Sequence, residues 1–271
     1  MDRRALLHTA EEIAREAGEL LLEHADRPLQ VREKGATDLV TSADQASEEL
    51  ILKRIRSAYP GHHILSEESA GKIEAIPSGA LWIVDPLDGT TNYAHGLPIW
   101  AVSIACWVDG ETLAGVVLDP ARGECFTAVR GEGARLNGRP IRVSTRDRLQ
   151  DALLVTGFPY DVHTSEVDNL DHFVNFMKRS RAVRRLGSAA IDLAYVACGR
   201  FDGFWELKLH PWDVAAGALI VEEAGGKVVN FDGAPFDPFS EEIVAANPKL
   251  LGPMAAILSQ GKRPARAGAS S

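Results

Sequence analysis

The order in which helical and extended segments follow one another constrains this chain more than any other feature of its sequence. Residues 3–24 and 42–57 carry apolar side chains at helical spacing, whereas residues 101–108 and 112–118 have the pattern of strands that meet at Asp109-Gly110, a dipeptide typical of tight hairpins. Helices and strands therefore come in blocks and not in strict strand–helix–strand alternation. This order predicts an α+β fold, a layered sandwich with at least one largely antiparallel sheet.

Shorter segments complete the expected secondary structure. Strands are expected at residues 63–66, 81–84, 153–156, 228–229 and 243–245, and helices at 167–179, 188–198, 212–223 and 248–258. Ser42 is expected to begin the second helix with Gln45 as its capping-box partner, after a polar loop over residues 31–40. Residues 261–271 are small and polar, and we expect them to form a disordered tail.

The composition excludes several classes of protein. Apolar residues make up 45% and charged residues 25% of the 271 positions, which is ordinary for a globular protein and not for a disordered or collagen-like chain. Asp and Glu outnumber Lys and Arg by 38 to 29, so the formal net charge is −9. This acidic balance argues against nucleic acid as the main ligand. It does not exclude small anionic substrates whose charge a metal ion or backbone amides would neutralise.

Compartment and membrane association are also constrained. The three cysteines, Cys106, Cys125 and Cys198, are widely spaced and form no CxxC pair, so we expect free thiols in a reducing compartment. Acidic side chains interrupt the apolar residues of the first 18 positions, unlike a signal peptide. No stretch approaches the ~18 consecutive apolar residues of a membrane span. We therefore expect a cytoplasmic protein that does not enter a membrane.

The segment with the most chemical information is WIVDPLDGTTN (82–92). Its apolar strand ends on two carboxylates, Asp85 and Asp88, and the proline between them restricts the turn. The following glycine allows close approach of the backbone, and the two threonines suit the N-cap of a helix. The segment thus offers carboxylates to a hard cation and backbone N–H groups to a phosphate. The structural alternative is a strand followed by an Asx-rich turn.

Further acidic residues lie at the expected ends of elements. Glu67 follows an expected strand, Asp213 begins an expected helix, and Asp44 lies in the first turn of another. Each has an ordinary explanation, as a solvated surface group or as an acid at a helix N-terminus. Together with Asp85 and Asp88 they form an oxygen-only set, which points to Mg²⁺ or Ca²⁺ rather than zinc. A pair of Mg²⁺ ions would relieve the repulsion among these carboxylates and suits phosphoryl displacement.

Two segments, DPLDGTT (85–91) and WDVAAG (212–217), resemble the signature motifs of the inositol monophosphatase family. The resemblance covers nearly the whole chain, because the segments at 34–45, 66–69, 187–190 and 222–226 match in the same order. Segments 184–190 and 202–206 most resemble the bacterial inositol-1-monophosphatases. The resemblance implies a layered αβαβα fold, with residues 1–260 as a single catalytic unit of subregions about 1–148 and 149–260. It also implies a homodimer, two or three Mg²⁺ ions per active site, and inhibition by lithium.

The resemblance assigns roles to individual residues. A first metal ion would be held by Glu67, Asp85 and the carbonyl of Leu87, a second by Asp85, Asp88 and Asp213, and a third, weaker one would share Glu67. Thr90, oriented by Asp44, would activate the attacking water together with Glu67. The substrate would be bound by Asp88, by the amides of Gly89 and Thr90 at the phosphate, and by Ala189, Glu206 and Asp213 at the inositol hydroxyls.

The implied reaction is hydrolysis of myo-inositol monophosphate to myo-inositol and phosphate. Because the sequence shows no cysteine, serine or aspartyl nucleophile with a base beside it, direct attack by water is favoured over a phosphoenzyme. Fructose 1,6-bisphosphate, histidinol phosphate and nucleotide 3′-phosphates stay open as alternative substrates. A second class also stays open, a regulatory binding protein that retains the fold, since some bacterial relatives have a transcription-associated role.

Several basic residues keep two interpretations at this stage. Arg184 and Arg185 are either a surface pair or contribute to binding of substrate phosphate or of a partner subunit. Lys208 and His210 either contact a second phosphate or face solvent. His95 is expected to pack against or cap the helix that follows the first motif.

Overall fold

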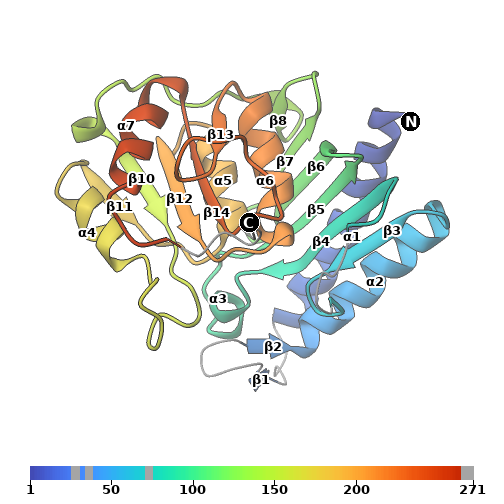
Figure 1. Cartoon of the computed structure of the whole chain (residues 1–271). Helices are drawn as coiled ribbons and strands as arrows, with labels where there is room; N and C mark the ends of the chain where they lie inside the picture. Colours follow the sequence, from blue (N-terminus) through green and yellow to red (C-terminus); the bar gives the residue numbers. More distant parts are fainter. Residues whose placement is uncertain (26–30, 34–38, 71–75, 264–271) are drawn as a thin grey trace, which may run out of the picture.

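The computed structural model describes residues 1–25, 31–33, 39–70 and 76–263. Two large sheets in this part of the chain alternate with helices, so that helices cover both outer faces and fill the space between the sheets (Figure 1). The order helix, sheet, helix, sheet, helix confirms the expected αβαβα sandwich.

The first sheet follows the order of the sequence and is largely antiparallel. Over the described residues it contains seven strands: β3 (His63–Ser66), β4 (Ala80–Asp88), β5 (Ala101–Val108), β6 (Glu111–Asp119), β7 (Glu124–Val129), β8 (Ala134–Leu136) and β9 (Arg139–Pro140). β3 pairs with β4 in parallel, and the later pairs are antiparallel. The β5–β6 hairpin turns at Asp109 and Gly110, as expected, and both have positive φ angles, 46° and 102°.

The second sheet is mixed. In the described chain it has the strand order β11-β10-β12-β14-β13. The strands are β10 (Leu153–Thr156), β11 (Ala182–Arg184), β12 (Gly203–Leu207), β13 (Lys227–Val229) and β14 (Glu242–Ala246). β10 is parallel to both β11 and β12, because helices carry the chain back between these strands, whereas β14 is antiparallel to β12 and β13.

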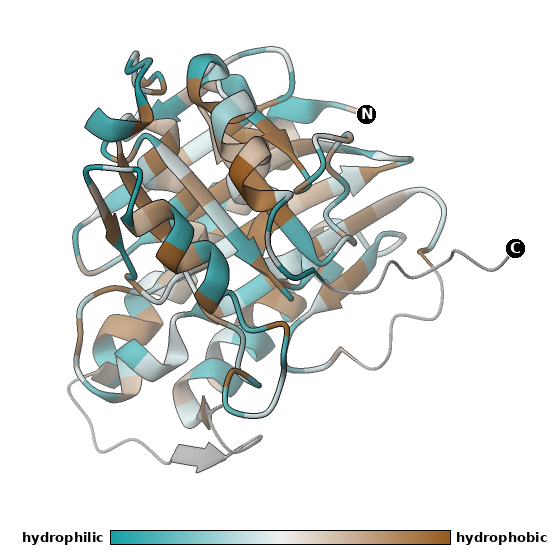
Figure 2. Cartoon of the chain, turned by 60° about the vertical axis from the view of Figure 1, so that its left-hand side comes forward, coloured by the Kyte–Doolittle hydropathy of each residue, from teal (hydrophilic) through white to brown (hydrophobic). Residues whose placement is uncertain are grey.

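Hydrophobic contacts divide the helices among the three helical layers. α1 (Arg3–Ala25) and α2 (Ser42–Ala58) cover one face of the first sheet, and α4 (Leu170–Met177) and α7 (Pro248–Leu258) cover the outer face of the second. α5 (Ala189–Ala197) and α6 (Pro211–Glu223) lie between the sheets and are apolar nearly all round. Along β4 the side chains alternate accordingly: Trp82 packs toward α1 and α2, and Ile83 toward α5 and α6. Figure 2 shows apolar segments along both sheets.

The N-terminal segment differs from the expectation of a polar loop over residues 31–40. β1 (Val31–Glu33) and β2 (Leu39–Thr41) form an antiparallel pair, and residues 34–38, part of the family resemblance, lie outside the described residues. The helix cap also differs. Thr41, not Ser42, is the N-cap of α2, and Asp44, not Gln45, completes the capping box. The Thr41 amide donates to Asp44 Oδ2 at 2.8 Å, which is the reciprocal bond of a capping box.

Three further boundaries are corrected. α3 (Thr90–Ala94) has Gly89 as its N-cap, in the left-handed conformation, in place of either threonine. α4 is shorter than the expected 167–179. Disorder of the tail is wrong for residues 261–263, because the Lys262 amide donates to Asp171 Oδ2 at 2.7 Å and Arg263 pairs with Glu242; residues 264–271 lie outside the described residues.

Cysteine and membrane predictions can be checked on the described residues. Cys106, Cys125 and Cys198 are free thiols, and the first two are buried, as expected. No helix in the described ranges combines the length and the apolar character that crossing a bilayer requires. The division into subregions near residue 148 stays a prediction.

Close packing of α6 against the first sheet generates a stability prediction. A Cβ atom at Gly115 in β6 would lie 3.1 Å from the Ala216 Cα of α6. Gly115→Ala is therefore expected to lower the free energy of unfolding by about 1–3 kcal/mol, as overpacked cores do. Urea denaturation measures this, with Gly61→Ala as control, since nothing lies within 4 Å of a Cβ there. An equal effect of both substitutions would contradict the close contact.

Candidate active site

A cavity of about 610 Å³ collects nearly all of the residues assigned from the sequence. Its lining includes Glu67, Asp85, Leu87, Asp88, Gly89, Thr90, Ala189, Glu206 and Asp213. Asp44 does not line the cavity but lies directly behind Thr90, to which it is hydrogen-bonded. Residues as far apart in the sequence as Glu67 and Asp213 thus meet near the ends of β4, α5, β12 and α6.

The end of β4 is shaped by its own hydrogen bonds. The register against β5 shifts between Asp85 and Asp88, which gives a bulge at the proline turn. Within this turn the Leu87 amide donates to Asp85 Oδ1 at 3.0 Å, and Ser47 Oγ donates to the Pro86 carbonyl at 2.8 Å. The bulge turns both carboxylates toward the same cavity, although two residues separate them.

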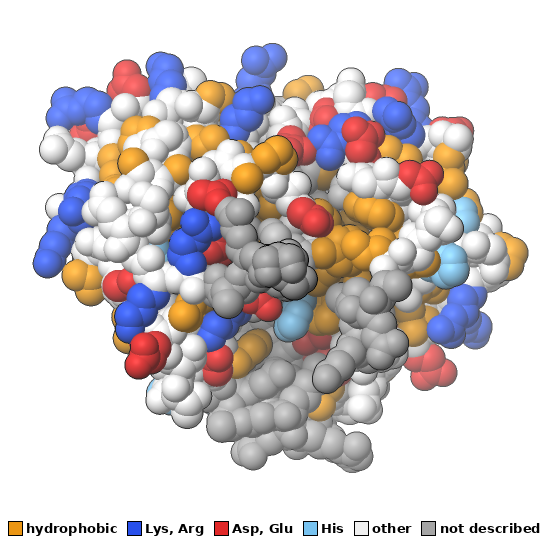
Figure 3. Space-filling view, viewed as in Figure 1, with side chains coloured by type: hydrophobic (Ala, Val, Ile, Leu, Met, Phe, Trp, Pro, Cys, Tyr) orange, Lys and Arg blue, Asp and Glu red, His pale blue; other side chains and the backbone are white. Residues whose placement is uncertain are grey.

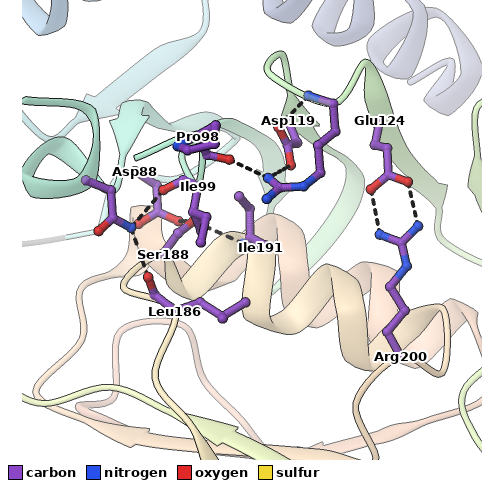
Figure 4. Close-up of polar contacts among 11 residues, drawn as sticks. Asp88, Pro98, Ile99, Asp119, Glu124, Leu186, Ser188, Ile191 and Arg200 are labelled. Carbon is purple, nitrogen blue, oxygen red and sulfur yellow. Dashed lines mark hydrogen bonds and ion pairs between the residues drawn. The ribbon is translucent and has the colours of Figure 1, made fainter. Parts of the chain in front are cut away.

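Asp88 joins the two halves of the site. Its Oδ2 accepts a hydrogen bond from Ser188 Oγ at 2.6 Å (Figure 4). The same oxygen accepts from the Ala190 amide at 2.8 Å, at the start of α5. Nearby, Asn92 Nδ2 donates to the carbonyls of Ile99 and Leu186 at 2.8 and 2.9 Å. These contacts hold α3 and the start of α5 in a fixed relation.

Thr90 has a defined hydroxyl environment. Its Oγ1 lies 2.9 Å from Asp44 Oδ1 and 3.0 Å from the Leu87 carbonyl, and both are acceptors for its single proton. Asp44 is fully buried, and Thr41 donates to its other oxygen. Burial raises the pKa of Asp44, and its hydrogen bonds from Thr41 and Thr90 oppose that increase. The Thr90 proton is therefore directed away from the cavity, which leaves oxygen lone pairs for a group inside it.

The carboxylates of the cavity repel one another. Burial and then the charges of Glu67, Asp88 and Asp213 raise the pKa of Asp85 well above its usual value. Burial and the charges of Glu67 and Asp88 likewise raise the pKa of Asp213. Burial raises the pKa of Asp88 to about 6, although Ser188 and the amides of α5 counteract it. Without a bound cation, this concentration of negative charge makes the folded state less stable.

The donor set fits Mg²⁺ in kind. The cavity offers carboxylate oxygens and a backbone carbonyl, which hard cations prefer. Across the described residues, however, no three His, Cys, Asp or Glu side chains are grouped as a formed metal centre. The fit is thus one of donor type and charge, and the side chains would need to adjust around an ion.

Glu206 lies on the side of the cavity formed by the second sheet. Burial and the charge of Asp88 raise its pKa to about 8, against the charge of Arg185 and a hydrogen bond from Gly157. A Cβ atom at Gly157 would lie 2.2 Å from Glu206 Oε1, so only glycine leaves room for this carboxyl group. Sequence reasoning assigned Glu206 from the resemblance and missed the supporting glycine.

The structure gives different surroundings to the basic residues whose roles the sequence left undecided. Arg185 lines the cavity, whereas Arg184 does not and donates to the Val183 carbonyl at 3.2 Å. Lys208 lines the cavity, but its Nζ contacts Asp161 Oδ2 at 2.6 Å and Ser165 Oγ at 2.8 Å. His210 is the N-cap of α6 and stacks on Trp212 with ring centroids 4.7 Å apart.

Two other observations bear on earlier expectations. His95 is the C-cap of α3, as expected of a residue that follows the motif. On the face drawn in Figure 3, acidic and basic side chains are interspersed.

Sequence reasoning missed Asp192, a buried acid in the cavity wall. The signal that could have identified it is an aspartate inside an otherwise apolar helix.

Comparison with solved structures defines the class of protein. The chain matches an inositol monophosphatase from Anabaena with a TM-score of 0.88 and 42% identity, covering 97% of this chain and 98% of that one. It matches SaIMPase-II bound to inositol monophosphate with a TM-score of 0.80 and 28% identity, covering 94% of each chain. The fold is thus that of the inositol monophosphatases.

The sequence comparisons agree. A protein of Pseudomonas aeruginosa named Nus factor SuhB is 50% identical over 254 residues, which are 91% of this chain and 93% of that protein. Residues 2–262 match the inositol monophosphatase family. The chain belongs to this family.

The raised pKa of Asp88 generates a prediction about stability. An exposed aspartate titrates near 3.9, so between that pH and about 6 the folded state binds more protons than the unfolded chain. The free energy of unfolding therefore falls as the pH rises through this interval. Asp88→Asn keeps an acceptor for Ser188, and we expect it to raise the free energy of unfolding of the metal-free protein by about 1–3 kcal/mol at pH 8 and by much less at pH 4.5.

Urea denaturation in EDTA at both pH values measures this effect. Asp202→Asn is the matched control, because Asp202 is also buried but accepts from the Leu153 amide at 2.7 Å and pairs with Arg146 at 3.3 Å. The control is expected to lose stability. A loss of stability in Asp88→Asn at pH 8 would contradict the increase in the pKa of Asp88 on burial.

Proposed function

We propose that the protein is a Mg²⁺-dependent phosphomonoesterase that hydrolyses myo-inositol monophosphate to myo-inositol and phosphate by direct attack of water. The observation that carries this proposal is the meeting of Glu67, Asp85, Asp88 and Asp213 with the Thr90–Asp44 pair around one cavity. The match to SaIMPase-II bound to inositol monophosphate supports the choice of substrate.

Glu67, Asp85 and the Leu87 carbonyl would hold one ion, Asp85, Asp88 and Asp213 a second, and a third, weaker one would share Glu67. When bound, Mg²⁺ supplies a Lewis acid that lowers the pKa of water and offsets charge on the leaving oxygen. Its charge would also remove the repulsion that raises the pKa values of these acids.

The chain's own groups orient the reactants. Thr90 Oγ1 donates its hydrogen bond to Asp44, so its lone pairs are free to accept from the attacking water. Glu67 also orients this water and deprotonates it. The amides of Gly89 and Thr90 bind the phosphate at the start of α3. Asp88, Ala189, Glu206 and Asp213 bind the substrate, and Glu206 and Asp213 accept hydrogen bonds from inositol hydroxyls.

Thr90 provides a kinetic test of this arrangement. Thr90→Ala is expected to lower kcat by about 10²–10⁴-fold with little change in KM, because orientation of water matters in the transition state. Steady-state phosphate release measures both constants. Thr91→Ala is the matched control, since Thr91 also lines the cavity but no described contact joins it to Asp44. An increase in KM at constant kcat would make Thr90 a group that binds the ground state.

The substrate is tested with a panel of phosphate esters. Phosphate release from myo-inositol 1-phosphate is compared with that from fructose 1,6-bisphosphate, histidinol phosphate and a nucleoside 3′-phosphate, with Mg²⁺ and with EDTA. We expect the inositol ester to have the highest kcat/KM, activity to require Mg²⁺, and Asp88→Asn to abolish it. The same proposal includes a cytoplasmic homodimer and inhibition by LiCl but not by NaCl. Full turnover by Asp88→Asn would exclude the proposed metal ligands.

A second candidate function is a regulatory role, favoured by the name Nus factor SuhB of the relative that is 50% identical. The two functions are separated by complementation of a Pseudomonas aeruginosa strain that lacks this relative. Rescue by the wild-type chain and equally by Asp88→Asn would support a role that is independent of turnover. Rescue by the wild type alone would tie the phenotype to catalysis.

A further inference from the structure

Asp192 is a buried acid in the cavity wall that the proposed reaction does not use. It lies in the first turn of α5, is 1% exposed, and lines the same cavity as Glu206 and Asp88. Its Oδ1 is buried and has no hydrogen-bond partner among the described residues. Folded proteins rarely leave a buried polar atom in this state unless a ligand or water completes its hydrogen bonds.

The local structure does not need this carboxyl group. Ser188 is the N-cap of α5 and accepts from the Ile191 amide, and Asp88 accepts from the Ala190 amide, so the start of the helix is already capped. The neighbours of Asp192 on the helix, Ile191 and Leu193, are fully buried apolar side chains.

The surroundings make the carboxyl group unfavourable in the empty cavity. Burial and then the charges of Glu206 and Asp88 raise the pKa of Asp192 well above its usual value. Arg185 is an exposed residue that lines the cavity. Its charge opposes these increases, because it favours the ionised forms of both Asp192 and Glu206. Two adjacent acids with few donors nearby are suited to a ligand that brings several hydroxyl groups.

We propose that Asp192 binds the substrate, and that with Glu206 it forms a subsite for the hydroxyl groups of a polyhydroxylated leaving alcohol. This inference rests on the proposed phosphomonoesterase function and adds a residue that determines specificity. A site built to hydrogen-bond hydroxyl groups discriminates strongly against an analogue that lacks them, because its buried polar atoms are then left unpaired. Of the acids proposed to accept from these hydroxyl groups, Asp213 is also a proposed metal ligand, whereas Asp192 and Glu206 are left to the alcohol alone.

The test compares two esters that share the phosphate but differ in hydroxyl groups, myo-inositol 1-phosphate and phenyl phosphate. The measured quantity is the ratio of their kcat/KM values. Asp192→Leu, which removes the acceptors at similar size, is expected to lower this ratio by about 10–100-fold. Asp192→Asn, which keeps one acceptor, is expected to lower it by about 3–10-fold. If the leucine variant does not fold, the asparagine variant decides alone.

Thermal unfolding without ligand gives a second readout. Both Asp192 variants are expected to melt at a higher temperature than the wild type, because they remove an unpartnered buried acid. Asp202→Asn is the control, a buried acid outside the cavity lining, and it should leave the ratio within twofold of the wild type.

The outcomes separate this inference from the proposed function. If the wild type hydrolyses neither ester with Mg²⁺, the proposed function is wrong. If the wild type hydrolyses both but shows no preference for the inositol ester, the subsite is wrong while the phosphatase stands. The subsite is also wrong if the ratio is unchanged in both Asp192 variants, or if Asp202→Asn lowers the ratio equally. A lower melting temperature with an unchanged ratio would assign Asp192 a structural role.

Discussion

Mutual repulsion among buried acids is the constraint on which the rest of this structure depends. Several carboxyl groups share one cavity, and burial together with their neighbours' charges raises the pKa values of Asp85, Asp213 and Glu206. A folded chain keeps such a cluster only if the surrounding layers are stable enough to hold it. The largely apolar packing of α5 and α6 between the two sheets provides that stability. The helices that carry Asp192 and Asp213 are thus also the most deeply packed in the described chain.

The layered architecture explains why the site needs both sheets. β4 ends on Asp85 and Asp88, whereas Glu206 belongs to β12, and neither sheet alone brings these groups together. The hydrogen bonds from Ser188 and Ala190 to Asp88 fix one half against the other. They also favour the ionised form of Asp88, so the contact that assembles the site helps to keep that acid ready for a cation.

Periodicity in the sequence predicted the fold well because each layer buries a regular face. The helical spacing of residues 3–24 and the strand pattern of 101–118 both reflect packing that repeats along the element. The cap of α2 was assigned one residue late because Thr41 and Ser42 are both good capping residues, and only the backbone conformation distinguishes them. The sequence could not separate Arg184 from Arg185, because which one faces the cavity depends on how the chain leaves β11. Asp192 was missed for a related reason, since its role depends on which side of a buried helix faces the cavity.

The acids of the cavity fall into two groups, and the cost of burying each group would be offset in a different way. Glu67, Asp85, Asp88 and Asp213 repel one another directly, and cations bound among them would relieve that repulsion. The charge of Asp88 also raises the pKa values of Asp192 and Glu206, which lie on α5 and β12 and not on the β4 turn itself. Cations at the β4 turn would weaken the effect of Asp88 and still leave the hydrogen bonds of Asp192 unmade. Under the proposed function, the hydroxyl groups of the leaving alcohol would complete hydrogen bonds that the metal ions do not, with Asp213 shared between the metal ions and the alcohol.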